Sequence, residues 1–102
     1  MPWIGSDEWG DGMEEAAGEL IIVNTLGLHA RPAAALVQTV LRFRSDVHIY
    51  SNGQKVNAKS IMGLLTLAAA QGTILSVTCK GEDAKEAFEA VSELIHSGFG
   101  EE

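Results

Sequence analysis

The chain has 102 residues, a formal net charge of −7 and a sequence pI of about 4.8. This length suffices for one domain with a modest core and is too short for two. The acidic balance argues against a broad electrostatic attraction to nucleic acid or to an anionic membrane. The apolar stretches are shorter than a membrane span, and Cys79 has no second cysteine with which to form an intramolecular disulfide. We therefore expect a cytoplasmic protein that binds neither membrane nor nucleic acid.

Residues 1–17 differ in composition from the rest, because acidic side chains alternate with glycines there. Such a composition favours a mobile segment. We therefore expect an acidic, flexible N-terminal extension over residues 1–17 and a folded domain over residues 18–102. Trp3 and Trp9 make the extension either a docking element or a simple tail, and Met13 is an alternative start of the protein.

A strand followed by a helix is expected at the beginning of the folded domain. Residues 20–23 (Leu-Ile-Ile-Val) have the composition of a strand, and apolar residues recur at helical spacing from Ala33 to Leu41. Between them lies the segment Gly-Leu-His-Ala-Arg-Pro-Ala of residues 27–33. It places His29 and Arg31 at the first turn of the helix, and Pro32 suits an early helical position where a missing N–H costs little.

His29 and Arg31 together predict a site for a phosphoryl group. Unpaired backbone N–H groups and the helix dipole stabilise a phosphate at the start of a helix. Imidazole is partly unprotonated and nucleophilic near neutral pH, and a guanidinium can hold phosphate oxygens in bidentate fashion. A lone histidine near a helix start is more often a solvated cap, but the flanking arginine and glycine favour the phosphorylatable site.

A β-hairpin and a short apolar helix are expected next. Residues 47–50 and 55–57 flank Asn52 and Gly53, a dipeptide that tolerates the positive φ angles of a tight hairpin turn. A second helix is expected from about Ser60 until Gln71 and Gly72 end it.

The last part of the chain predicts a strand and an amphipathic helix. Residues 73–80 alternate, with Leu75, Val77 and Cys79 on one side of the strand. The final helix should start near Asp83 with an approximate capping box to Glu86, and end at Gly98. The fold class is therefore α+β, a two-layer sandwich in which a four-stranded antiparallel sheet carries three helices on one face and leaves the other open.

Ser60 is a second candidate site. Serine is a favoured helix N-cap, and a phosphate added there would face the positive end of the helix. The neighbouring Ile61, Met62 and Leu65 are either core residues or an exposed apolar patch for a partner. His48, His96 and Cys79 show no metal-ligand spacing, and no nucleotide-binding loop is present, so no metal or cofactor is expected.

These motifs resemble the HPr family, the histidine-containing phosphocarrier proteins of the phosphoenolpyruvate-dependent sugar phosphotransferase system. The resemblance runs over roughly residues 19–100 and rests on residues 27–33, on residues 52–63 and on Gln71-Gly72-Thr73. It implies an open-faced β-sandwich and a phosphocarrier without enzymatic turnover of its own. His29 would accept the phosphoryl group on Nδ1 from enzyme I and donate it to enzyme IIA domains, with Arg31 as the phosphate clamp.

The resemblance also implies that Ser60 is the regulatory serine modified by an HPr kinase/phosphorylase, with Ile61, Met62 and Leu65 as partner-binding residues. Leu26 departs from the family pattern, because a small or polar residue is expected before Gly27. Two alternatives remain open: a regulatory module that acts mainly through phosphorylated Ser60, and a carrier in a nitrogen-related phosphorelay. A monomer is expected.

Overall fold

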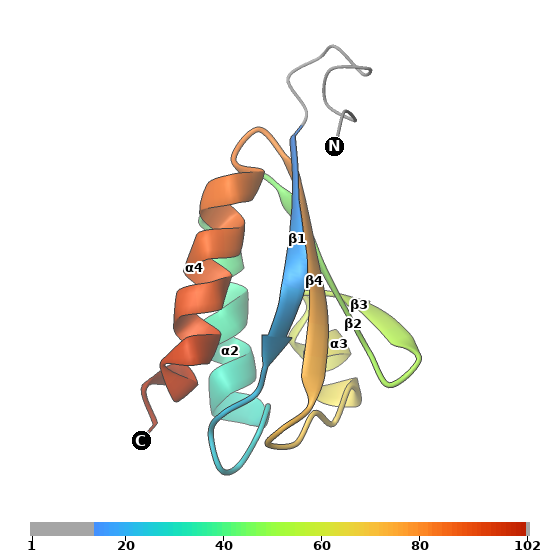
Figure 1. Cartoon of the computed structure of the whole chain (residues 1–102), viewed down its shortest axis with the longest axis vertical. Coiled ribbons are helices and arrows are strands. Elements are labelled where there is room, and N and C mark those ends of the chain that lie inside the picture. The colour runs from blue at the N-terminus through green and yellow to red at the C-terminus, as the bar shows by residue number, and fades with distance from the viewer. Residues whose placement is uncertain (1–13, 102) are drawn as a thin grey trace.

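The computed structural model describes residues 14–101. The elements in chain order are β1 (Glu14–Ile21), α2 (Ala30–Val40), β2 (Asp46–Ser51), β3 (Gln54–Asn57), α3 (Ile61–Thr66), β4 (Ile74–Gly81), α4 (Ala84–His96) and the 3-10 turn η1 (Gly98–Gly100). The four strands form one antiparallel sheet in the order β1-β4-β2-β3 (Figure 1). The predicted fold class and element order are confirmed.

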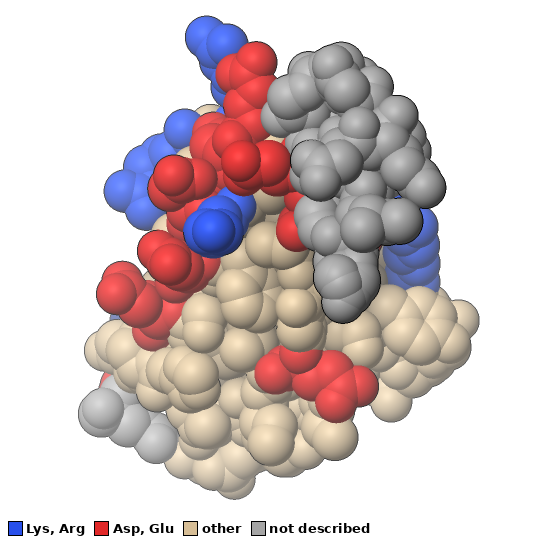
Figure 2. Space-filling view, turned by 45° about the horizontal axis from the view of Figure 1, so that its top comes forward, with Lys and Arg blue, Asp and Glu red and all other residues tan. Residues whose placement is uncertain are grey.

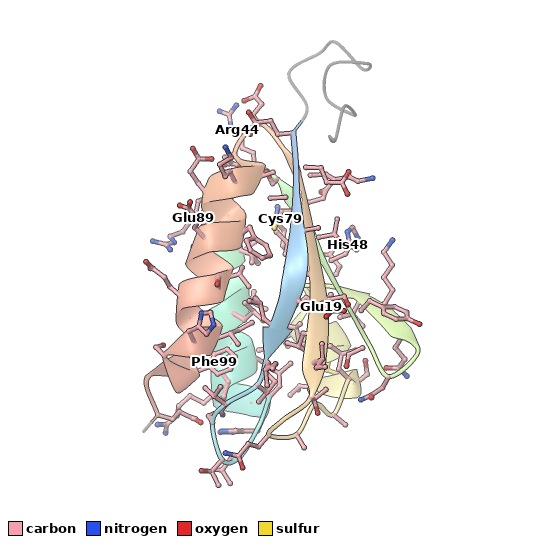
Figure 3. All side chains as sticks on the ribbon, viewed as in Figure 1. Glu19, Arg44, His48, Cys79, Glu89 and Phe99 are labelled. Atoms are coloured by element: carbon pink, nitrogen blue, oxygen red, sulfur yellow. The ribbon has the colours of Figure 1, made fainter. Side chains whose placement is uncertain are left out.

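The hydrophobic core lies between the sheet and the helices. The predicted alternation in β4 is confirmed, since Leu75, Val77 and Cys79 are buried. Figure 3 shows His48 and Glu19 on the opposite side of the sheet, a face that no helix of residues 14–101 covers. Burial raises the pKa of the Cys79 thiol to about 11, and the negative charge of Asp83 makes a smaller contribution in the same direction. Cys79 is therefore a core residue with an unreactive thiol.

Strand β1 begins earlier than the composition predicts. Glu14 to Ala17, expected in the acidic extension, belong to the sheet because they pair with β4. Glu15 stands opposite Lys80, so opposite charges face each other across the two strands. Residues 1–13, with Trp3, Trp9 and Met13, lie outside the described residues.

The hairpin turn is confirmed, but the helix after it is shorter than expected. Asn52 and Gly53 both have positive φ, 53° and 79°, as the tight turn requires. Helix α3 ends at Thr66 and does not continue to Gln71, because the chain turns at Ala68 with φ 49°. This turn buries Leu67 and Ala69, the residues on either side of it, in the core.

Helix α4 begins at Asp83 as predicted, but the capping box with Glu86 is wrong. The Asp83 side chain makes no hydrogen bond to its own helix. Its carboxylate accepts hydrogen bonds from the Arg44 N–H and the Ser45 N–H, each at 2.9 Å, and from the Ser45 hydroxyl. These hydrogen bonds lower the pKa of Asp83, the one from the Ser45 hydroxyl most of all. The carboxylate thus fixes the loop between α2 and β2.

Candidate functional site

The loop between β1 and α2 is held against the segment that follows α3. Gly27 has φ +72°, and a Cβ atom on it would lie 2.5 Å from the carbonyl oxygen of Ala69. Only glycine fits this close approach. The next residue, Leu28, is buried and donates its N–H to the same carbonyl at 2.8 Å. These contacts fix the backbone that leads directly into His29.

His29 is the N-cap residue of α2, yet its side chain does not cap the helix. Its backbone is extended, with φ −92° and ψ −167°, and its carbonyl accepts the first helical bond from Ala33 at 2.9 Å. Pro32 has no N–H, so the open donors of the first turn are those of Ala30 and Arg31. Within residues 14–101 neither N–H has a hydrogen-bond acceptor. This helix start therefore presents backbone N–H donors beside an imidazole.

The Arg31 side chain is exposed in the first turn of the same helix. Among the described residues no carboxylate lies within ion-pair distance of its guanidinium. An exposed arginine next to open amide donors can provide planar, charge-assisted hydrogen bonds to an oxyanion. His29 and Arg31 thus both lie at the start of α2, as the sequence predicts.

The imidazole of His29 is held by the C-terminal end of the chain. Its Nε2 lies 2.9 Å from Oε2 of Glu101, and the side chains are 38% and 15% exposed respectively. The other carboxylate oxygen, Oε1, accepts a hydrogen bond at 2.9 Å from the amide nitrogen of Asn24, which also donates to the carbonyl of Gly27 at 2.8 Å. Figure 1 shows that the end of α4 lies at the same end of the molecule as the start of α2.

Asn24 and Glu101 are site residues that the sequence reasoning missed. Their side chains meet although 77 positions separate them in the chain. Asn24 is a buried polar residue just after β1, and its Oδ1 is buried with no hydrogen-bond partner in the described part of the chain. A polar residue at the end of an apolar strand was the available signal, but nothing in the sequence identifies its partner.

Ser60 begins a different helix, α3, which packs against α2. Its hydroxyl oxygen accepts a hydrogen bond from the N–H of Gly63 at 3.0 Å, so the N-cap reading is confirmed. Ile61 and Met62 are exposed, at 39% and 68%, whereas Leu65 is half-buried and packs against the core. The predicted apolar patch therefore consists of Ile61 and Met62, and Leu65 contributes to both surface and core.

The residue before Gly27 adds to the apolar surface around the site. Leu26 is 72% exposed, and Val23 is also exposed. In Figure 2 most charged side chains gather over the upper part of the view, at the end of the molecule away from the start of α2 (Figure 1). A partner that docks over Leu26 and Val23 would bury this apolar surface.

Within residues 14–101, no helix has both the length and the apolar character needed to cross a membrane. The same residues contain no group of three or more histidine, cysteine or acidic side chains arranged to hold a metal ion.

The chain is similar to known proteins over most of its length. A family model described as "PTS HPr component phosphorylation site" matches residues 16–97. A phosphocarrier protein HPr from Xylella fastidiosa is 51% identical over 84 residues, which cover 82% of this chain and 94% of that protein. The crystal structure of an HPr from Thermoanaerobacter tengcongensis superposes with a TM-score of 0.82 at 45% identity, covering 85% of this chain and 98% of that one.

The chain is also similar to the HPr-like protein Crh of Bacillus subtilis. The two are 51% identical over 69 residues, which cover 68% of this chain and 81% of Crh. A crystal structure of Crh, described as a swapped dimer, has a TM-score of 0.66 and 47% identity, and the match covers 72% of this chain and 85% of that one.

Proposed function

This chain belongs to the HPr family of phosphocarrier proteins, and from this premise we propose that His29 is its phosphoryl acceptor. The phosphoryl group comes from phosphorylated enzyme I and passes on to enzyme IIA domains. The protein then acts as a covalent intermediate between two histidines and has no turnover of its own. The observation that carries this proposal is the start of α2, where an imidazole that does not cap its helix stands beside open amide donors.

The mechanism assigns one role to each group at this helix start. The unprotonated nitrogen of His29 attacks phosphorus in line with the bond to the donor histidine, which takes back its electron pair. The N–H groups of Ala30 and Arg31 and the helix dipole stabilise the negative phosphoryl oxygens. The Arg31 guanidinium holds two of these oxygens in bidentate fashion. No cofactor or metal is needed for this transfer.

Ser60 is the second proposed site, for regulatory phosphorylation by an HPr kinase/phosphorylase. Its exposure supports access by a kinase, and its cap bond to Gly63 uses an oxygen that can still accept when esterified. Ile61 and Met62 are proposed to contact enzyme I, together with Leu65 at the edge of the patch. A phosphate on Ser60 adds nearly two negative charges beside this surface and would slow docking there.

We place the protein in the cytoplasm as a monomer, where enzyme I and the kinase would reach it. The swapped dimer described for Crh makes the oligomeric state a point to measure. Light scattering of the full chain at several concentrations gives the mass directly.

The test of the main proposal is intact mass spectrometry after incubation with enzyme I and phosphoenolpyruvate. The expected result is a gain of one phosphoryl group that brief acid treatment removes, because phosphohistidine is acid-labile. His29→Ala should gain none and should keep the wild-type circular dichroism spectrum, since the imidazole makes no bond to its helix. Ser60→Ala is the matched control and should accept phosphate normally. Acceptance by His29→Ala would refute the assignment.

A regulatory module is the second candidate, and the similarity to Crh favours it. In that case the main output is binding of a partner by phosphorylated Ser60. The same experiment distinguishes the two functions. No gain from enzyme I, with acid-stable phosphate on Ser60 after addition of the kinase and ATP, would support the regulatory module.

A further inference from the structure

Three side chains from distant parts of the chain meet at the site. Asn24 follows the end of β1, His29 precedes α2 and Glu101 lies after η1. The carboxylate of Glu101 stands between the other two, 2.9 Å from the Asn24 amide nitrogen and 2.9 Å from Nε2 of His29. The contact is sheltered, because Asn24 is 1% exposed and the Glu101 side chain 15%.

The turn after α4 is built to bring Glu101 to this place. Gly98 and Gly100 have φ +68° and +73°, and Phe99 between them has φ 60°, a conformation that a bulky side chain rarely adopts. The Phe99 ring packs against the core at the foot of α4 (Figure 3), which compensates for the unfavourable backbone. Gly98 lies against Asn24, and a Cβ built on it would be 3.6 Å from the Asn24 Cβ.

The hydrogen-bond roles follow from the chemistry of the groups. An ionised carboxylate only accepts hydrogen bonds, so Nε2 must carry the hydrogen in the contact with Glu101. A neutral imidazole has a single N–H, and the lone pair then resides on Nδ1. Nδ1 makes no hydrogen bond to the residues that the structure describes. The nucleophilic nitrogen is therefore Nδ1, on the opposite side of the ring from Glu101.

We propose that Glu101, held in place by Asn24, is a positioning residue for His29. It keeps the hydrogen on Nε2, fixes the ring orientation and balances the positive charge that the ring acquires on phosphorylation. This inference rests on the proposed phosphocarrier function.

The charge balance of the transfer explains why a carboxylate is useful. The Nδ1 lone pair forms the new bond to phosphorus, the bond from phosphorus to the donor histidine breaks, and its electron pair returns to the donor ring. Because the hydrogen on Nε2 stays in place, the His29 ring becomes cationic in the product. A carboxylate at 2.9 Å stabilises this cation in the way that the acidic member of a catalytic triad stabilises its imidazolium. Glu101 thus favours the phosphorylated state of His29.

Three variants of the full chain separate charge from position. Glu101→Gln keeps the size and an acceptor oxygen but removes the charge, and Glu101→Ala removes both. Glu89 is an exposed residue on α4 (Figure 3), and Glu89→Gln is therefore the matched control for loss of one negative charge.

The first readout is ¹⁵N NMR of the neutral His29 ring in the unphosphorylated protein, which needs no partner. We expect hydrogen on Nε2 in the wild type and Glu89→Gln, and a mixture of both tautomers in Glu101→Ala. A tautomer mixture in the wild type, or an unchanged ring in Glu101→Ala, would overturn the inference.

The second readout is the equilibrium between phosphorylated enzyme I and phosphorylated His29. We expect Glu101→Gln to shift it about threefold to tenfold toward enzyme I, because a hydrogen bond between neutral groups is weaker than one to a charged group. Glu89→Gln should leave it unchanged, and an equal shift in the two variants would contradict the proposal. If the wild type accepts no phosphate at all, the proposed function fails, while the NMR readout still tests the contact between Glu101 and His29.

Discussion

The two candidate phosphorylation sites both precede a helix, but their side chains are used in opposite ways. Ser60 caps its own short helix, because its hydroxyl accepts from the N–H of Gly63. The His29 side chain makes no hydrogen bond to α2, and its ring is held by Glu101, which the fold brings from the other end of the chain. Ser60 is exposed, whereas His29 is partly buried.

The side chain at the start of α3 stabilises its helix, whereas the start of α2 remains available to bind a ligand. At α3 the first-turn donors are partly satisfied by the N-cap residue itself, which stabilises a helix with few buried residues. At α2 the helix has four buried residues to anchor it, so the fold does not need a cap there. The donors of α2 and the imidazole therefore remain available to a ligand.

The largest effect is expected from Arg31→Ala, which removes the clamp from the open helix start. We expect the rate of phosphorylation by enzyme I to fall about tenfold to a hundredfold, because a lost charge-assisted hydrogen bond costs about 1.5–3 kcal/mol. Arg31→Lys should recover only part of the rate, since an ammonium cannot bind two oxygens in one plane. Rapid-quench assays measure both rates. A wild-type rate in Arg31→Ala would show that the helix amides suffice alone.

Asp83 tests a third helix start, where the N-cap side chain serves only the fold. Asp83→Ala leaves the Arg44 and Ser45 donors without their acceptor, and Ser45 is fully buried. We expect a loss of about 2 kcal/mol in the free energy of unfolding, measured by urea denaturation, with unchanged phosphorylation of His29.

The lowered pKa of Asp83 also predicts that part of the free energy of unfolding is lost in acid. Because its pKa is lowered in the folded protein, its contribution is complete above the usual aspartate pKa of about 3.9 and is lost as the pH falls through the lowered value. The stability difference between wild type and Asp83→Ala should therefore shrink in acid. A constant difference would exclude Asp83 as the titrating group.

A negative charge at Ser60 should slow phosphorylation of His29 without contacting it. We expect Ser60→Asp to slow phosphorylation of His29 by enzyme I about tenfold, because the charge lies on the proposed docking surface beside Ile61 and Met62. Stopped-flow or quench assays at two salt concentrations give the rate and its screening. Ser92→Asp, on α4, is the control, and an equal decrease there would point to overall charge rather than docking.

The smallest effect concerns the cap itself. Ser60→Ala should lower the free energy of unfolding by about 1 kcal/mol, the usual cost of losing a serine N-cap. His29→Ala should cost less, because no helix bond is lost. Thermal denaturation of the two variants compares the helix starts directly. A larger loss in His29→Ala would mean that the contact with Glu101 carries stability.

Local patterns predicted most of the fold. The Asn52-Gly53 turn, the alternation in β4 and the amphipathic spacing in α4 are short-range signals, and each is confirmed. The start of β1 was missed because acidic residues near a chain end resemble a tail, while the pairing of Glu15 with Lys80 depends on a strand 65 positions away. The end of α3 was missed because burial of Leu67 and Ala69 favours a turn at Ala68 over continued helix.

The candidate site likewise has one part that local patterns predict and another that they do not. His29 and Arg31 lie within one helical turn, so their proximity follows from spacing alone. The contact of Asn24 with Glu101 depends on the positive φ of Phe99 and on the packing of α4, which no local pattern encodes. The expected capping box at Asp83 is absent for the same reason, because the Asp83 carboxylate binds a loop from a distant part of the chain.

The reactivity of the single cysteine, Cys79, can report how often the folded protein opens. Cys79 lies in the central part of the sheet, fully buried and with its pKa raised to about 11. A thiol reagent can therefore modify it only in molecules whose sheet has opened. The labelling rate of every variant above then reports how often the fold opens, with no probe added and no residue near His29 disturbed.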